Sequence, residues 1–209
     1  MKIFSFKKCA LWFAFIYAVT AAAAERENLE PCETSEYYTR IDKLMDDAVK
    51  QKARLAITVV PSYEAEAGLR IGDDSVALVQ FDKSFWRQTW VKETSGGNHQ
   101  DFSLPRVQTT VDRATLRGET IRRILPLFRD AIAGAKPAAR QQLDGVSYRF
   151  SVDGAGCAAI PWLGGDAKDG PLARLVKLLA NHAETKDAAA AKASEDKIVS
   201  LLEALQAVK

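Results

Sequence analysis

Residues 146–152 read VSYRFSV, and they carry the clearest two-residue alternation of apolar and polar side chains in the chain. Successive side chains of a β-strand point to opposite faces, so Val146, Tyr148 and Phe150 are predicted to share one face. An Asp-Gly turn follows, and residues 157–162 are expected to return as a short strand beside the first. The sequence therefore predicts an antiparallel hairpin at this point.

Further strands are predicted on the N-terminal side of this hairpin. Residues 55–60 read LAITVV, an apolar run rich in β-branched residues that is typical of a buried strand. Residues 67–71 and 75–81 are separated by a Gly-Asp-Asp turn, so we expect them to form a second hairpin. Residues 84–93 read SFWRQTWVKE and predict an aromatic-rich strand, with a return strand over residues 106–111.

Helices are predicted where apolar residues recur three or four positions apart. The first covers residues 35–52, and the second covers residues 112–134, capped by Asp112 and bent or divided at Pro126. A third begins at Pro171, because proline is favoured in the first turn of a helix. Strands and helices do not alternate as regular βαβ units, so the predicted class is α+β, a mostly antiparallel sheet packed by helices.

The C-terminal residues differ in composition from the rest of the chain. Asp187 to Ala193 is alanine-rich and is predicted to be a tether, followed by an extra amphipathic helix with Ile198 and Leu202 in its apolar stripe. We expect this helix to dock on its own domain, with oligomerisation or tethering as the alternative. The predicted organisation is a signal peptide at 1–24, a single α+β domain at 25–184, and the tether and helix at 185–209.

The N-terminus has the layout of a secretory signal peptide. Lys2, Lys7 and Lys8 precede a short apolar segment that ends in an alanine cluster, so cleavage is expected near Ala24. The apolar segment is shorter than the about 20 residues that a membrane-spanning helix needs. We therefore expect a soluble periplasmic or secreted protein without a stable membrane span after leader cleavage, and the bacterial character of the leader favours the periplasm.

Export also determines how the cysteines are interpreted. The mature chain keeps Cys32 and Cys157, and two thiols in an oxidising compartment allow one intramolecular pairing. A redox-active pair is the alternative, but the C-x-x-C spacing that lowers a thiol pKa is absent. The sequence therefore predicts one structural disulfide between Cys32 and Cys157.

The charge of the mature chain gives no indication of a polyanionic partner. The leader holds three of the 29 Lys and Arg residues and none of the 27 acidic residues, which leaves 26 basic against 27 acidic side chains. A nucleic-acid-binding protein would first be recognised by a strongly basic face. No nucleic-acid partner is expected.

The sequence contains no motif that is typical of a metal site or of a catalytic nucleophile. His99 and His182 do not form an H-x-x-x-H pair that would place two ligands on one helix face, and exposed, non-catalytic positions are expected for both. The glycine-containing loop before Pro171 lacks the alternating oxygen ligands of a calcium loop. No G-x-S-x-G motif is present. We assign no metal, no cofactor and no catalytic residue.

Four acidic residues provide the one hydrolytic alternative. Glu64 and Glu66, followed by Asp73 and Asp74, could supply two carboxylates for hydrolysis of a wall glycan. That chemistry needs two acids at a controlled separation in one cleft. Acids beside glycine are more often solvated turn residues, and this is the interpretation that we favour.

Two groups of side chains are candidates for a binding surface. Arg113 and Arg117 belong to a series that also contains Arg122, Arg123 and Arg129 and gives the second predicted helix a basic side. Trp86 and Trp90 fall on one face of the predicted aromatic strand, where their rings could stack on sugar or anchor a protein partner. Burial of these rings in the core is the alternative that we favour.

These observations favour a non-enzymatic exported protein of the binding, inhibitor or immunity type. A compact disulfide-containing domain without a catalytic motif needs only a surface to function. The expected partner is another envelope or exported protein. A cell-wall-directed hydrolase that uses loop carboxylates is the alternative.

Overall fold

The computed structural model describes five segments of the chain, namely residues 29–92, 97–103, 107–137, 145–163 and 170–207. The proposed leader at residues 1–24 lies outside the described residues, and so does most of the loop before Pro171. Within the described residues, no helix combines the length and the apolar character that a membrane crossing requires.

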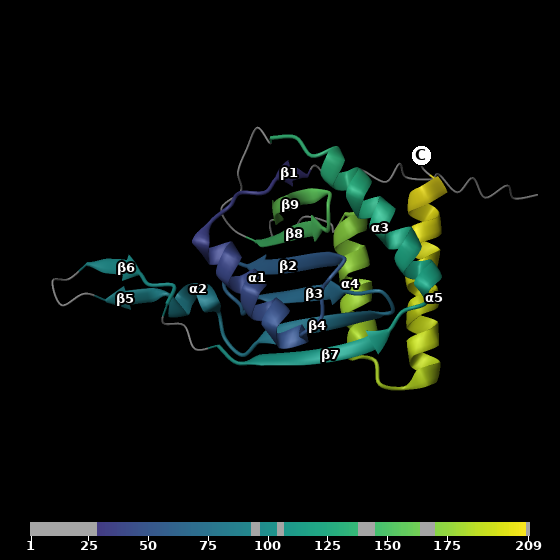
Figure 1. The fold of residues 1–209 in the computed structure, drawn as a ribbon, viewed down its shortest axis with the longest axis horizontal. Helices are drawn as coiled ribbons and strands as arrows, with labels where there is room; N and C mark the ends of the chain where they lie inside the picture. The colour runs from purple at the N-terminus through teal and green to yellow at the C-terminus, as the bar shows by residue number, and fades with distance from the viewer. Residues whose placement is uncertain (1–28, 93–96, 104–106, 138–144, 164–169, 208–209) are drawn as a thin grey trace, which may run out of the picture.

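One seven-stranded sheet forms the centre of the molecule (Figure 1), and it confirms the predicted α+β class. The strand order is β1-β9-β8-β2-β3-β4-β7, and each pair of neighbours is antiparallel. The predicted hairpin is formed by β8 and β9, where Phe150 faces Ala158 across the pair. The strands are β1 (Glu30–Pro31), β2 (Leu55–Pro61), β3 (Ala67–Ile71), β4 (Ser75–Phe81), β7 (Thr109–Thr115), β8 (Val146–Val152) and β9 (Gly156–Leu163).

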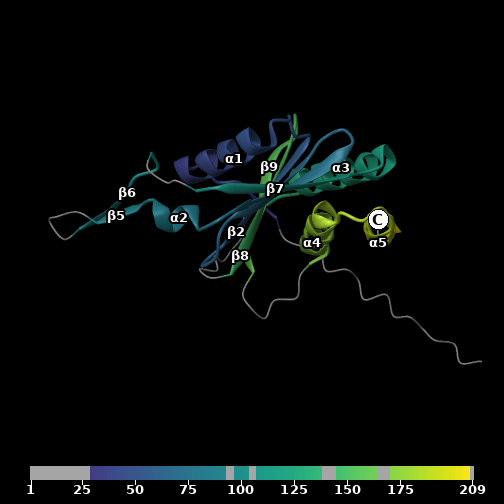
Figure 2. The ribbon, with the colours of Figure 1, turned by 90° about the horizontal axis from the view of Figure 1, so that it is seen from below.

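Helices cover both faces of the sheet, and Figure 2 shows α1 (Glu36–Val49) and α4 (Pro171–Glu184) on opposite sides of it. α4 begins at Pro171 as predicted. On the side of α4, buried residues of the sheet pack against α3 (Gly118–Ala133), with the Phe128 and Phe150 ring centroids 5.0 Å apart. On the side of α1, a second buried cluster joins Ile41 and Met45 to the sheet.

A buried arginine fixes α1 on its face of the sheet. Arg70 on β3 is almost fully buried, and its Nε donates to Asp46 Oδ1 on α1 at 2.6 Å. A second nitrogen lies 3.3 Å from Asp42 Oδ1, and Nη1 donates to the carbonyl oxygens of Ile57 and Leu69. A buried charge is tolerated when it is paired and hydrogen-bonded, so α1 has one favoured position on the sheet.

The predicted aromatic strand over residues 84–93 is wrong. Phe85 to Gln88 forms a short helix, α2, and the chain then makes a hairpin of β5 (Trp90–Lys92) and β6 (Asn98–Gln100). Ser84 caps α2 by accepting a hydrogen bond from the Arg87 amide, and the Glu66 carboxylate accepts from two further α2 amides. The two hydrogen bonds to Glu66 come from outside residues 84–93, and they override the local strand preference of that segment. We call α2, β5 and β6 the arm, which extends from one end of the sheet (Figures 1 and 2).

The predicted start of the second helix is also wrong. Asp112 lies within β7, and the return strand expected over residues 106–111 is displaced to Thr109–Thr115. α3 begins at Gly118, where the Glu195 carboxylate accepts hydrogen bonds from the Arg117 amide at 2.8 Å and the Thr120 hydroxyl at 2.7 Å. Pro126 lies inside α3, which continues through it as one helix. The cap that defines this helix therefore comes from the C-terminal helix.

The C-terminal helix, α5 (Ala188–Ala207), contains the alanine-rich segment that we expected to be a tether. It contacts α4 and α3, and Ile198 and Leu202 are fully buried. Because alanine has the highest helix propensity, the alanine run extends the helix once the apolar stripe is docked. The helix therefore packs on its own domain.

Replacement of Glu195 by glutamine is expected to weaken the docking of α5 in a pH-dependent way. Burial raises the pKa of Glu195, but hydrogen bonds from Thr120 and Arg117 outweigh it, so the pKa lies below its ordinary value of 4.5. Stability from a carboxyl with a lowered pKa is present above that ordinary value and is lost as the pH falls through the lowered one.

Glu195→Gln should therefore reduce the free energy of unfolding by about 1–3 kcal/mol at about pH 7, and by much less at about pH 2. Urea unfolding at the two pH values measures this difference. Glu203→Gln, which removes an exposed carboxylate of the same helix that pairs with Arg123, is the matched control. An equal loss of stability at both pH values would contradict the assignment.

Candidate functional site

A cleft of about 620 Å³ lies where the arm joins the body of the protein. Five aromatic side chains contribute to its lining, namely Tyr37, Tyr38, Tyr63, Trp86 and Phe102. The remaining lining residues are Ser35, Glu36, Val60, Pro61, Ser62 and Gln100. The walls thus come from the start of α1, the end of β2, α2, and the end of β6 with Phe102 after it, four segments that are separate in the sequence.

The first wall is the N-terminal turn of α1. Ser35 caps this helix by accepting a hydrogen bond from the Tyr38 amide. The Cys32–Cys157 disulfide, predicted from the sequence and present in the structure, lies just before the cap and joins it to β9, with a Cα–Cα distance of 5.5 Å. Because β9 belongs to the central sheet, the disulfide attaches this wall of the cleft to the core.

The second wall is the end of β2 and the residues that follow it. The Ser62 amide donates to the Gly145 carbonyl at 2.9 Å, and the Gly145 amide donates to Ser62 Oγ at 2.9 Å. These bonds hold Ser62 in place, and with it the adjacent Pro61 and Tyr63. The Tyr63 side chain is 67% exposed, and the Arg87 guanidinium lies 6.0 Å from the centre of its ring. Tyr63 therefore offers a largely solvent-facing aromatic surface to the cleft.

The third wall is the arm, and Glu66 positions it. The Glu66 side chain is buried, and Tyr37 Oη donates to its Oε1 at 2.6 Å. The Phe85 amide donates to Oε2 at 2.6 Å, and the Trp86 amide donates to Oε1 at 3.0 Å. One carboxylate thus joins α1 to α2, and it fixes the relative positions of Tyr37 and Trp86 in the cleft.

Aromatic contacts continue from the cleft onto the arm. The Tyr37 and Trp86 rings meet edge to face with centroids 5.1 Å apart, and the Trp86 and Trp90 rings do so at 5.9 Å. Trp86 is 39% exposed and Trp90 is 47% exposed. The structure therefore contradicts our preference for tryptophans buried in the core. They lie in a solvent-facing aromatic series, although not on one strand as expected.

A second arginine, Arg149, contacts the aromatic lining of the cleft. The Arg149 guanidinium lies 3.8 Å from the centre of the Tyr38 ring, and its Nη1 donates to the Glu33 carbonyl at 2.9 Å. Burial lowers the pKa of Arg149 from its ordinary value. Burial is also the main cause of the raised pKa of Tyr38. Both groups keep their ordinary charge states near neutral pH, so Arg149 supports Tyr38 as a cation beneath an aromatic ring.

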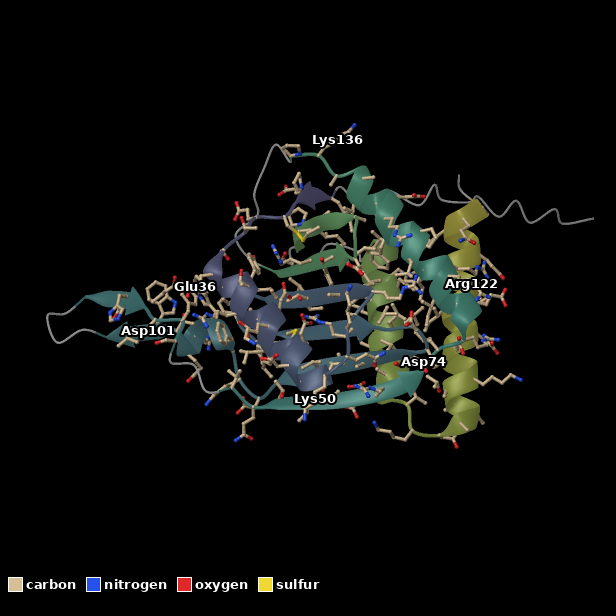
Figure 3. The ribbon with its side chains drawn as sticks, viewed as in Figure 1. Glu36, Lys50, Asp74, Asp101, Arg122 and Lys136 are labelled. Carbon is tan, nitrogen blue, oxygen red and sulfur yellow. A yellow bond between two sulfur atoms is a disulfide. The ribbon has the colours of Figure 1, made fainter. Side chains whose placement is uncertain are left out.

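Two carboxylates belong to the segments that form the cleft. Glu36 lines it directly, and Asp101 lies between the lining residues Gln100 and Phe102. Figure 3 labels both at the end of the molecule where α1 begins. Asp101 accepts hydrogen bonds from the Ser103 amide and hydroxyl, which lower the pKa of its carboxyl. Among the described lining residues, Glu36 is therefore the one carboxylate, and Asp101 is adjacent in sequence to two lining residues.

The two arginines predicted for a binding surface have structural contacts elsewhere. Arg113 on β7 donates to the Val49 carbonyl at the end of α1. Arg117 pairs with Glu195 and Asp196 of α5. Neither of them lines the cleft. The two arginines were therefore expected on one binding surface, but in the fold they make separate structural contacts.

The remaining polar candidates also differ from expectation. His182, expected to be exposed, is buried, and its Nε2 lies 2.8 Å from the Thr115 carbonyl oxygen. Glu66, expected in a solvated turn, is the buried residue described above, whereas Glu64 is exposed and Asp73 pairs with Arg54. Among the described residues, no group of three or more potential metal ligands comes together.

Most of the cleft was missed in the sequence because its residues lie in four separate segments. Only Trp86 was named as a candidate. An adjacent pair of tyrosines, Tyr37 and Tyr38, at the start of an amphipathic helix was the available signal, because an aromatic residue at the end of a helix is often only partly buried. Comparisons of this chain with protein-family models, with curated proteins and with solved structures found no match.

Proposed function

We propose that this chain is a non-enzymatic binding protein of the exported type, and that the aromatic cleft receives a polypeptide segment of another envelope or exported protein. An inhibitor or an immunity-type protein would use such a surface. The disulfide and the layout of the first 24 residues support export to an oxidising compartment.

The observation that carries this proposal is the exposure of aromatic rings around a preformed cleft. Large aromatic side chains are normally buried, and they dominate the binding energy of protein interfaces when they are exposed. Here Tyr63 and Trp86 are exposed, while Glu66 and Tyr37 hold the cleft in shape. A rigid aromatic surface loses little side-chain entropy when a partner binds.

The side chains of the lining favour binding over hydrolysis. Hydrolysis of a glycan requires two carboxylates in one cleft. Among the residues that line this cleft, Glu36 is the single carboxylate, and the nearby Glu66 already accepts hydrogen bonds on both oxygens. Apolar ring surface with a few polar groups is typical of a recognition site.

Replacement of Trp86 by alanine is expected to remove partner binding while the fold is kept. Trp86 is partly exposed, so its loss should have a small effect on stability, whereas truncation of a central aromatic residue typically weakens binding by about 2 kcal/mol or more. Mature wild-type and Trp86→Ala proteins can be immobilised and exposed to envelope extract, and the retained proteins compared by mass spectrometry.

The control for this experiment is Arg122→Ala, which changes an exposed residue on α3 at the other end of the molecule (Figure 3). The proposal predicts a protein that is retained stoichiometrically by wild type and by the control but not by Trp86→Ala. Equal retention by all three proteins, or retention of nothing by wild type, would contradict it. Urea unfolding of each variant checks that the fold is kept.

A further inference from the structure

The buried carboxylate of Glu66 has no positively charged partner in the described part of the chain. Its three hydrogen-bond partners are the Tyr37 hydroxyl and the amides of Phe85 and Trp86, all of which donate to it. Acceptance of three hydrogen bonds is the pattern of an ionised carboxylate. Buried carboxylates are usually paired with a cation, as Glu195 is with Arg117 in the same protein. Glu66 is thus a buried negative charge that hydrogen bonds stabilise and that no cation of the described residues neutralises.

This charge lies directly behind the cleft. Two of the three groups that hold it, Tyr37 and Trp86, are themselves cleft residues. Burial raises the pKa of Tyr37 above its ordinary range, and the charge of Glu66 raises it further, as expected for a negative charge beside this ring. Because charges interact more strongly away from water, the electrostatic effect of Glu66 should reach the space in front of these rings.

Two further carboxylates belong to the segments around the cleft. Glu36 lines it and Asp101 is adjacent in sequence to two lining residues, and the Arg40 that pairs with Glu36 does so across an exposed contact of 3.3 Å, which neutralises it weakly. Two other arginines near the cleft, Arg87 and Arg149, lie against the rings of Tyr63 and Tyr38. They show that these aromatic rings accept guanidinium groups, and they leave the Tyr37 and Trp86 rings in front of Glu66 without a cation.

Building on the proposed function, we propose that the cleft receives a cationic side chain, an arginine or a lysine, carried by the extended segment of the partner protein. Its charged group would lie among the rings of Tyr37, Tyr63 and Trp86, where cation–π attraction and the charge of Glu66 act together. The apolar stem of the same side chain would contact Val60 and Pro61. An anionic or purely apolar segment would gain only part of this energy.

Selection from a random dodecapeptide phage library tests the chemistry of the occupant. The mature wild-type protein should enrich peptides with arginine or lysine at a fixed position, and the enriched peptide should bind more weakly when that residue is replaced by methionine. Glu66→Gln, which removes the charge, should reduce the affinity for the cationic peptide about tenfold. The affinity for the methionine peptide should change less, and isothermal titration calorimetry measures both.

Two further proteins keep the test decisive if Glu66→Gln disturbs the arm. Glu195→Gln is the matched control, because it neutralises a buried, hydrogen-bonded carboxylate far from the cleft and should leave affinity unchanged. The double variant Glu36→Gln with Asp101→Asn removes the exposed carboxylate of the lining and the carboxylate beside Gln100 and Phe102, and it should weaken binding of the cationic peptide several-fold.

Enrichment of acidic or uncharged peptides, or of no peptide, would overturn this inference. So would equal affinity of wild type and all charge variants for the cationic peptide. These results leave the proposed function to its own test, because loss of a natural partner from Trp86→Ala does not depend on the charge of the segment that is bound. If the wild-type protein selected no cationic peptides but still retained its natural partner, this inference would be wrong while the proposed function would stand.

Discussion

Reduction of the Cys32–Cys157 disulfide should lower the free energy of unfolding by up to about 4–5 kcal/mol. The bond joins residues 125 positions apart, so its removal restores a large amount of conformational freedom to the unfolded chain. It also connects the beginning of α1 to β9, and its loss should loosen the wall of the cleft that contains Tyr37 and Tyr38. Urea unfolding with and without dithiothreitol measures the effect.

The double variant Cys32→Ser with Cys157→Ser provides the control for this prediction. Its unfolding midpoint should match that of the reduced wild type and should not respond to dithiothreitol. If the reductant left the wild-type midpoint unchanged while free thiols were detected, the disulfide would not carry this stability. A midpoint that shifted equally in both proteins would indicate an effect of the reductant unrelated to the bond.

The second large effect is expected from Glu66→Ala. This change leaves the Tyr37 hydroxyl and the amides of Phe85 and Trp86 without their acceptor in a buried position. Each unsatisfied buried donor costs about 1–3 kcal/mol, and release of the desolvated charge offsets part of the sum, so we expect a loss of about 2–4 kcal/mol. Urea unfolding measures the stability, and tryptophan fluorescence reports the surroundings of the tryptophans, Trp86 among them.

Glu64→Ala is the matched control, because it removes an exposed acid two residues away. It should leave both stability and fluorescence close to wild type, since exposed substitutions usually change stability by less than about 0.5 kcal/mol. Similar results for Glu64→Ala and Glu66→Ala would contradict the role assigned to Glu66. A stable Glu66→Ala protein with unchanged tryptophan fluorescence would also contradict it.

The elements that the sequence predicted correctly are those determined by nearby residues. The alternation in residues 146–152 gave β8, the Gly-Asp-Asp turn gave the β3–β4 hairpin, and Pro171 marked the start of α4. Each of these signals is complete within about ten residues. The disulfide was predictable for a different reason, because two cysteines allow a single pairing.

The elements that were predicted wrongly depend on residues far away in the chain. α2 forms because Glu66, in the loop between β2 and β3, accepts hydrogen bonds from its first amides. α3 begins at Gly118 because Glu195 of α5 caps it, and Asp112 is left in β7. Local patterns do not contain such caps, so a local helix or strand preference was overruled by tertiary contacts.

The candidate site was predictable only through its tryptophans. Trp86 and Trp90 were recognisable in the sequence as two large aromatic residues close together. Their exposure follows from the arm, which local patterns did not predict. Tyr63 and Phe102 become relevant when β2 and the arm are brought together. Arg113 and Arg117 illustrate the opposite error, because a basic helical pattern was recognised in a segment that is partly strand.

The most direct test of the aromatic cleft as a protein-binding site is photo-cross-linking in living cells. A photo-reactive phenylalanine analogue would replace Tyr63, and in a control it would replace Arg122 on the opposite end of the molecule. The account predicts a discrete cross-linked complex from position 63 that is absent from position 122, and that is lost when Trp86→Ala is added. No complex at position 63, or the same complex from both positions, would contradict it.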